Sequence, residues 1–188
     1  MKIGIVGLGS IGRRHAGHLL ELGAEVCALR SGAKGAPGDE RIRSTSDPDV
    51  FYSARLDAVV IATPTSLHGR DLEGARRAQV RCLVEKPLVG SLSELPELTS
   101  TEEERVRVAF CLRFHPLVEE VRKRLNAGLI GRPLRARLSF ESYLPAWQPG
   151  TDYRTGYAAR RDLGGGVLRT ASHEVDLAQH WLGPYEAV

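Results

Sequence analysis

Three glycines near the start of the chain have the spacing of a phosphate-binding loop. Gly7, Gly9 and Gly12 form the pattern G-x-G-x-x-G, in which Ser10 and Ile11 precede the last glycine. In such a loop the first glycine permits a tight turn, the second lets the backbone approach a pyrophosphate, and the third allows a helix to pack closely on a strand. The amides that open the helix would face the phosphates. The pattern predicts a dinucleotide site, and the alternative is an ordinary glycine turn.

The choice of dinucleotide depends on the residues about 20 positions further on, where an acidic side chain would hold the adenosine ribose. This chain has Leu29, Arg30 and Ser31 there, and none of them is acidic. An arginine can hold a 2′-phosphate through a charge-assisted hydrogen bond. We therefore expect Arg30 and Ser31 to bind the cofactor, and NADP to be preferred over NAD. In the alternative, Arg30 is a solvated residue at a strand end.

A charged pair, Glu85-Lys86, stands between an apolar run and Pro87. The run, residues 82–84, is typical of a buried strand. On periodicity alone, the pair is interpreted as a surface ion pair at the end of that strand.

The elements that would position these residues alternate between strands and helices. Short apolar runs predict strands, and apolar positions at helical spacing predict helices. The strands are expected at 2–6, 24–29, 56–63, 81–85 and 106–111, and the helices at 11–22, 67–79 and 91–100. A stretch rich in Gly, Ala and Pro predicts a loop at 31–40. The alternation predicts the α/β class with a doubly wound, Rossmann-type parallel sheet.

The pattern changes after His115, where we expect a first domain, 1–115, to give way to a second, α+β domain at 116–188. The second part contains a predicted helix at 116–127, an alternating stretch typical of a half-solvated strand at 133–142, an irregular segment at 143–161, and a glycine turn at 164–166 that leads into a helix.

Several motifs, taken in order, resemble those of the Gfo/Idh/MocA family of oxidoreductases, also called the glucose–fructose oxidoreductase and inositol dehydrogenase family. They are the glycine loop and residues 62–68, 85–87, 113–116, 164–166 and 173. The resemblance covers nearly the whole chain. It implies a Rossmann domain that binds NAD or NADP and a second domain with a mostly antiparallel sheet. It also implies hydride transfer between the nicotinamide and a hydroxyl or carbonyl carbon of a sugar, sugar nucleotide or polyol.

In this family the lysine that corresponds to Lys86 lies beside the nicotinamide and the reacting carbon, and the proline after it is commonly cis. Lys86 would then point from the carboxyl end of its strand into the crevice in which open α/β sheets bind ligands. There it could stabilise a developing alkoxide and exchange a proton. Glu85 would orient Lys86 or contact the nicotinamide ribose.

The resemblance also implies that Thr63, Pro64 and His68 lie against the cofactor. An alternative interpretation of the same stretch is a turn that starts a helix, with Thr65 or Ser66 as its cap. Both interpretations can hold together.

The second half of the implied site is the helix after the glycine turn. His173 is the expected acid/base, because an unperturbed histidine pKa of about 6.5 suits proton transfer at neutral pH. Asp176 shares its helix face and is expected to orient the ring. The family usually has an aspartate four residues before the histidine, whereas this chain has Arg169, or Thr170 after a one-residue shift. The alternatives are a backbone-bonded His173, and a regulatory or sensor protein that binds NAD(P) without catalysis.

Aromatic and basic residues are expected to border the substrate, because sugars stack on aromatic rings and arginines clamp carboxylates or phosphates. They are Arg113, Tyr143, Trp147, Tyr153, Arg154 and Tyr157, together with His173. The alternative is that they anchor a long loop. The Ser-His-Glu-x-Asp form of the helix resembles a family branch associated with surface-polysaccharide and nonulosonic-acid sugars.

Composition excludes several other classes of protein. The chain has 188 residues and a net charge of +3, too small to indicate a nucleic-acid partner. No apolar run approaches the roughly 20 residues of a membrane helix. We expect no signal peptide, no membrane partner and a cytoplasmic location. The cysteines, Cys27, Cys82 and Cys111, lie singly in apolar runs and are expected to be buried free thiols.

Two further expectations concern metals and assembly. His173, Asp176 and His180 fall at i, i+3 and i+7 of a helix, but no further ligand cluster supports a metal site, so none is predicted. Members of the family are usually longer, so the chain is expected to be a fragment or to have an abbreviated second domain. A short sheet would leave an open edge. We therefore expect a homo-oligomer that assembles through the sheet of the second domain.

Overall fold

The computed structural model describes residues 1–31, 39–147, 150 and 152–186. Most of the predicted loop at 31–40 thus lies outside the described residues. The chain divides into two compact units. Unit 1 comprises Met1–Ala109 with Asp162–Gly164, and unit 2 comprises Phe110–Arg161 with Gly165–Val188.

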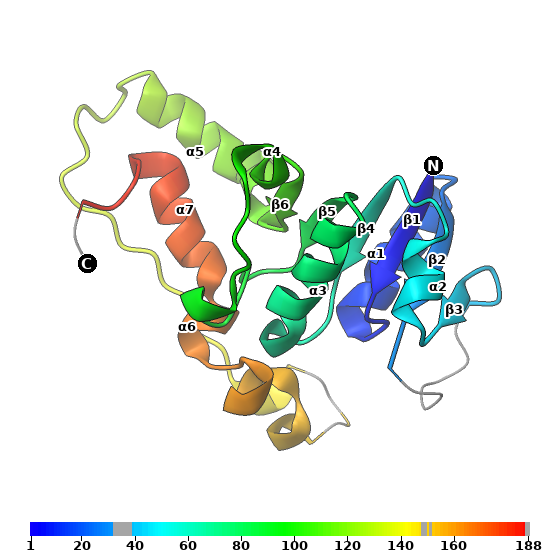
Figure 1. The fold of residues 1–188 in the computed structure, drawn as a ribbon. Helices are drawn as coiled ribbons and strands as arrows, with labels where there is room; N and C mark the ends of the chain where they lie inside the picture. The colour runs from blue at the N-terminus through cyan, green and yellow to red at the C-terminus, as the bar shows by residue number, and fades with distance from the viewer. Residues whose placement is uncertain (32–38, 148–149, 151, 187–188) are drawn as a thin grey trace. The chain divides into compact units, whose positions relative to one another are not determined.

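Unit 1 contains a six-stranded sheet in the order β3-β2-β1-β4-β5-β6 (Figure 1). All of its neighbouring strands are parallel. The strands are β1 (Lys2–Val6), β2 (Glu25–Leu29), β3 (Arg43–Thr45), β4 (Ala58–Ile61), β5 (Arg81–Val84) and β6 (Val106–Val108). The predicted doubly wound Rossmann sheet is confirmed.

Two layers of helices cover the sheet because its strands carry apolar side chains on both faces. On one face Ile5, Val26 and Val60 pack with Ala16 and Leu19 of α1 (Ser10–Glu21). On the other, the strands pack against α2 (Pro48–Tyr52) and α3 (Thr65–Arg77) through Phe51, Leu72 and Ala75. The core therefore lies in two slabs on either side of the strands.

Two elements of unit 1 escaped the sequence analysis. Strand β3 has three residues and no fully buried side chain, so it shows no apolar alternation; it forms because it pairs with β2. Helix α2 had a usable signal in Asp47-Pro48. The Asp47 carboxylate accepts hydrogen bonds from the amides of Asp49 and Val50, and Pro48 occupies the first helical position.

The helix predicted at 91–100 is wrong. The segment contains a 3-10 turn, η1 (Leu92–Glu94), and a helix begins only at α4 (Ser100–Glu103). Pro96 disfavours the helical conformation of Leu95, which is extended at ψ 121°. Helix α4 then begins with a capping box between Thr99 and Glu102.

Helix α3 also begins earlier than predicted, at Thr65 rather than at Leu67. Its N-cap is Pro64, which makes no side-chain capping bond. The interpretation of Thr65 or Ser66 as the cap is therefore wrong, since both residues lie within the first turn.

Unit 2 is built from helices and 3-10 turns. They are η2 (Cys111–Phe114), α5 (Pro116–Asn126), η3 (Leu144–Ala146), η4 (Tyr153–Thr155), η5 (Tyr157–Ala159), η6 (Arg161–Leu163), which begins in this unit, α6 (Val167–Thr170) and α7 (Ser172–Leu182). The indole nitrogen of Trp181 in α7 donates to the carbonyl of Val118 in α5 at 3.2 Å. These helices agree with the predicted 116–127 helix and with the helix after the glycine turn.

The structure does not show the strand predicted at 133–142. These residues have no ladder partner, and most of their side chains are exposed. A strand needs a neighbour to bond its amides and carbonyls. The alternation of apolar and polar residues was therefore not sufficient to predict a strand.

The cysteine prediction holds only in part. All three cysteines are free thiols, but Cys82 is buried, Cys27 is half-buried and Cys111 is exposed. Cys111 stands in the 3-10 turn after β6 rather than in the strand that its apolar neighbours predicted. Within the described residues, no helix combines the length and apolar character needed to cross a membrane.

Candidate functional site

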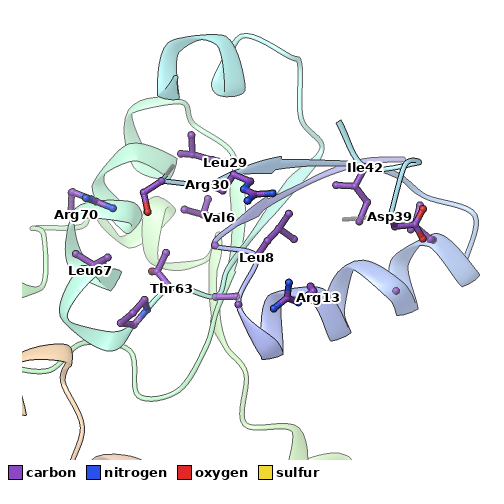
Figure 2. A pocket seen from close by; sticks show the side chains of 17 residues that line it. Val6, Leu8, Arg13, Leu29, Arg30, Asp39, Ile42, Thr63, Leu67 and Arg70 are labelled. Carbon is purple, nitrogen blue, oxygen red and sulfur yellow. The ribbon is translucent and has the colours of Figure 1, made fainter. Parts of the chain in front are cut away.

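A cavity of about 630 Å³ lies at the carboxyl edge of the sheet in unit 1 (Figure 2). The loops after β1, β2 and β4 border it, through residues that include Gly9, Arg30 and Thr63. Strands β2 and β4 lie on opposite sides of β1, so the chain reverses direction across the sheet at this point. Such switch points are where open α/β sheets bind ligands.

The glycine loop has the shape that a close approach to phosphates needs. Gly7 has φ +92°, and a side chain there would lie 2.9 Å from Thr63 Cγ2. A Cβ on Gly12 would lie 1.9 Å from the Gly7 carbonyl oxygen, so only glycine lets α1 pack against the loop. A Cβ on Gly9 would meet nothing within 4 Å. Gly9 therefore faces open space beside the cavity, where a pyrophosphate would fit.

The start of α1 adds amide donors to this region. Its N-cap is Gly9, which makes no side-chain capping bond, and its first turn has no acidic residue. Helix α1 has 12 residues, so its N-terminus carries a partial positive charge. Ser10 and Ile11 open the helix. The residues present therefore fit a dinucleotide diphosphate.

The rim of the cavity is basic. Arg13 from α1, Arg30 at the end of β2 and Arg70 from α3 border it in Figure 2, and Ser31 also belongs to the lining. The acidic residue of the lining, Asp39, is bound by the guanidinium of its neighbour Arg41 at 2.8 Å. This hydrogen bond lowers the pKa of Asp39 to about 2. The charges favour an anionic ligand.

The loop after β4 is held from beneath by buried polar side chains of α3. The hydroxyl of Thr63 donates to Asp71 Oδ2 at 2.7 Å, and the other oxygen of Asp71 accepts from Arg70 at 2.7 Å. Thr63 and Pro64 line the cavity. His68, expected to lie against the cofactor, is only 1% exposed, and its ring nitrogens face the carbonyl oxygens of Thr63 and Pro87. His68 thus supports the lining without belonging to it.

The Glu85-Lys86-Pro87 segment follows β5, and the peptide bond between Lys86 and Pro87 is cis, as the resemblance implied. Glu85 accepts a hydrogen bond from the Lys86 amide at 3.2 Å, and its other oxygen lies 2.7 Å from Nε2 of His15 in α1. Burial acts to raise the pKa of Glu85, but the hydrogen bonds and charges of His15 and Lys86 together outweigh it, and the pKa is lowered. The ionised carboxylate of Glu85 therefore connects α1 to the backbone of Lys86.

Four side chains of this region went unrecognised in the sequence: Arg13, His15, Arg70 and Asp71. Arg13 and His15 lie in α1, about one helical turn after Gly9 and Gly12. This spacing was a usable signal that both side chains lie near the loop. Asp71 had no signal, because its burial and its partners exist only once α3 packs on the sheet.

Unit 2 contains the predicted acid/base. The ring of His173, near the start of α7, packs edge-on against Phe110 with 6.0 Å between centroids. Arg113 lies over the same Phe110 ring at 5.6 Å. Both carboxylate oxygens of the buried Asp176 accept hydrogen bonds from Arg113. Asp176 and Arg113, predicted for different roles, thus form one ion pair, which raises the pKa of Arg113.

The other residues expected at the substrate also belong to unit 2. Tyr143 is 75% exposed, Trp147 packs edge-on against Phe140, and Arg154 lies 5.5 Å from the Tyr153 ring. Tyr157 is half-buried in η5, and Arg169 and Thr170 lie in α6. Among the described residues, no group of three or more His, Cys, Asp or Glu side chains could hold a metal ion.

Two family models match this sequence. The first, an oxidoreductase family with an NAD-binding Rossmann fold, matches residues 1–112. The second, the GFO/IDH/MocA C-terminal domain, matches residues 118–188. The chain belongs to the Gfo/Idh/MocA oxidoreductase family. The glycine loop and the cavity beside it are therefore parts of an NAD-binding Rossmann domain.

Relatives within the Gfo/Idh/MocA family include two inositol dehydrogenases. Inositol 2-dehydrogenase 4 of Saccharopolyspora erythraea is 34% identical over 146 residues, which cover 71% of this chain and 43% of that protein. The scyllo-inositol 2-dehydrogenase (NAD(+)) of Bacillus subtilis is 32% identical over 146 residues, with 71% and 42% covered. The chain thus spans less than half the length of these two relatives.

A solved structure has a similar fold. The WlbA (WbpB) dehydrogenase of Thermus thermophilus, in complex with NAD and UDP-GlcNAcA, matches all of this chain at a TM-score of 0.74 and 22% identity. The match covers 65% of that chain. At this identity the likeness concerns the fold alone.

Proposed function

We propose that this chain provides the cofactor-binding part of an NAD(P)-dependent oxidoreductase that transfers hydride between the nicotinamide and a hydroxyl or carbonyl carbon of a sugar, sugar nucleotide or polyol. The observation that carries the proposal is the cavity beside the glycine loop, bordered by three arginines at the switch point of the sheet. The dinucleotide diphosphate would lie against Gly9 and the first turn of α1, and the adenosine ribose against Arg30 and Ser31.

The cofactor supplies the hydride chemistry, and the protein residues supply binding and proton transfer. Lys86 would stabilise the oxygen of the reacting carbon, with Glu85 as its support. His173 would exchange the hydroxyl proton. Asp176 would act on His173 indirectly, by holding Arg113 against the Phe110 ring on which His173 packs.

The finer proposal is a preference for NADP. Arg30 is the feature that supports it, because a guanidinium can pair with a 2′-phosphate and the end of β2 offers no carboxylate to a free ribose. Asp39 also lines the cavity, but both of its carboxylate oxygens already accept hydrogen bonds from Arg41. Asp39 is therefore a poor acceptor for the ribose hydroxyls of NAD.

The substrate is proposed to contact the aromatic and basic residues of unit 2, from Arg113 to Tyr157. The inositol named for the two relatives, a polyol, supports this class of ligand. Residues 133–142 are proposed to pair with further strands in a mostly antiparallel sheet, and the alternating pattern of these residues supports this.

Calorimetric titration with NAD and NADP, oxidised and reduced, is the first test. We expect binding of both cofactors, with NADP tighter. A folded chain that binds neither would refute the cofactor-binding role.

Turnover is tested next, with sugars, sugar nucleotides and polyols as substrates. The Lys86→Met variant should retain cofactor binding and lose most of its turnover, whereas Lys123→Met, in α5, should retain both. Cofactor binding without turnover of any substrate would favour a regulatory or sensor role, for which Arg169 in place of the usual aspartate is the supporting observation.

A further inference from the structure

We propose that His68 is a positioning residue that ties the cofactor loop after β4 to the Lys86–Pro87 turn after β5. The inference rests on the proposed function, because it assigns to a buried side chain the alignment of two loops that serve the same nicotinamide. It gives His68 no contact with the cofactor or with the substrate.

The two contacts of the ring are short and lie inside the protein. Nδ1 is 2.9 Å from the carbonyl oxygen of Pro87, and Nε2 is 2.9 Å from the carbonyl oxygen of Thr63. His68 is 1% exposed, so water does not compete for either nitrogen. A buried histidine with both nitrogens on backbone carbonyls has a defined orientation and cannot rotate without losing a bond.

The place of this tie in the sheet indicates its purpose. The amide of Glu85 donates to the carbonyl of Ile61 at 2.9 Å and thereby extends the backbone ladder between β4 and β5 one residue beyond the Ile61–Val84 pair. Two residues further along each segment are Thr63 and Pro87. The imidazole bridges these two residues, so it continues the connection between the segments where the backbone ladder stops.

Each end of the tie holds a residue next to the proposed chemistry. Thr63 lines the cavity, and its hydroxyl is independently held by Asp71. Pro87 follows Lys86, the proposed catalytic lysine. Fixing both carbonyls therefore fixes the wall of the cofactor cavity relative to Lys86.

The two carbonyl partners decide which hydrogens the ring must carry. A carbonyl oxygen only accepts hydrogen bonds, so a ring nitrogen must carry a hydrogen to bond it. A neutral imidazole has one N–H and would bond only one of the two carbonyls, so the tie requires a hydrogen on each ring nitrogen. No uncharged side chain of similar size offers two donors on opposite sides of a ring.

Two variants separate the two ends. In His68→Asn the amide nitrogen takes roughly the place of Nδ1 and retains the bond to Pro87. In His68→Gln it takes roughly the place of Nε2 and retains the bond to Thr63. The Asp71→Asn variant weakens the hold on Thr63, together with the contact to Arg70, and leaves the Pro87 end untouched, so it is the comparison for the first end.

Two readouts report the ends separately. Calorimetry with NAD and NADP measures cofactor affinity, which depends on the position of Thr63 in the cavity wall. The pH dependence of the rate at which an amine reagent labels Lys86 depends on the Pro87 turn, and Lys123 is the internal reference. We expect His68→Asn and Asp71→Asn to weaken cofactor binding about tenfold with unchanged Lys86 labelling. His68→Gln should shift the Lys86 profile and keep cofactor affinity within about twofold. Equal effects of both His68 variants on both readouts, or no effect, would overturn the tie.

A measurement on the unsubstituted chain covers the case in which the variants do not fold. Nitrogen NMR of the imidazole rings reports which ring nitrogens carry hydrogens and how fast these exchange with water. A ring N–H of His68 should exchange far more slowly than that of the exposed His18. A hydrogen on only one ring nitrogen of His68, or exchange as fast as that of His18, would refute the tie. If the chain binds neither cofactor while the His68 hydrogen is protected, the proposed function fails and the tie stands.

Discussion

The contact between His15 and Glu85 makes the stability of unit 1 dependent on pH. Burial acts to raise the pKa of Glu85, but the pKa is lowered in the folded protein because the hydrogen bonds and charges of His15 and Lys86 together outweigh burial. A lowered carboxyl pKa stabilises the folded state above the unfolded value of about 4.3, and this stabilisation disappears as the pH falls through the folded pKa. Glu85→Gln should therefore cost on the order of 1–2 kcal/mol at pH 7, and this cost should disappear as the pH falls through the lowered pKa of the folded Glu85.

Denaturant unfolding between pH 3 and pH 7 measures this difference. Glu21→Gln is the matched control, because Glu21 contacts His18 at 3.4 Å on an exposed face, where such pairs contribute little. A Glu85→Gln variant whose stability follows that of the unsubstituted chain at every pH would contradict the prediction.

The arginines of the cavity rim are predicted to act on different parts of the cofactor. Arg30→Ala should weaken NADP binding by about ten- to a hundredfold and leave NAD binding nearly unchanged, because only NADP carries the 2′-phosphate. Arg13→Ala should weaken both cofactors equally through the shared diphosphate. Arg14→Ala is the control, since Arg14 is an exposed neighbour that does not line the cavity. Calorimetry measures the affinities. An equal loss of NAD and NADP affinity in Arg30→Ala would show that the assignment of Arg30 to the 2′-phosphate is wrong.

At the scale of elements, two glycines inside helices should respond in opposite ways to alanine. A Cβ on Gly69 in α3 would lie 2.0 Å from the backbone oxygen of Glu94 in η1, whereas a Cβ on Gly17 in α1 would meet nothing within 4 Å. Gly69→Ala should therefore destabilise the protein by about 1–3 kcal/mol or more. Gly17→Ala should stabilise it by about 0.5–1 kcal/mol through helix propensity. Denaturant titration compares both, and a loss of stability in Gly17→Ala would refute the second part.

The elements that the sequence predicted correctly are those whose local signals agree with their tertiary surroundings. Strands β1, β2, β4 and β5 are apolar and are covered on both faces, so their composition reports their place in the sheet. Strand β3 and residues 133–142 show the opposite case. The first is polar yet pairs, and the second alternates yet lacks a partner, because pairing depends on what lies alongside.

At the scale of the whole molecule, unit 2 exposes many large apolar side chains. Leu117, Leu129, Ile130 and Leu134 are each at least 68% exposed, and Phe140 is 49% exposed. Apolar surface of this extent favours association. We expect the chain to form homo-oligomers at micromolar concentration, and Leu134→Glu to weaken them. Sedimentation equilibrium tests this, and a well-folded monomer at these concentrations would contradict it.

The sequence by itself determined the fold class, the glycine loop and the position of Lys86 after a buried strand. These features depend on short stretches of chain, in which the residue types directly limit backbone conformation and burial. The same reasoning placed Arg30 at the end of β2, where it borders the cavity.

Only the tertiary structure decided which side chains meet. It paired His15 with Glu85, Thr63 with Asp71, and Arg113 with Asp176, partners that lie 70, 8 and 63 residues apart in the chain. It also placed His68 beneath the cavity lining, where the sequence had predicted a cofactor contact. Hydrogen bonds and burial of this kind depend on distances that arise when helices pack on the sheet, and no local pattern of residues encodes those distances.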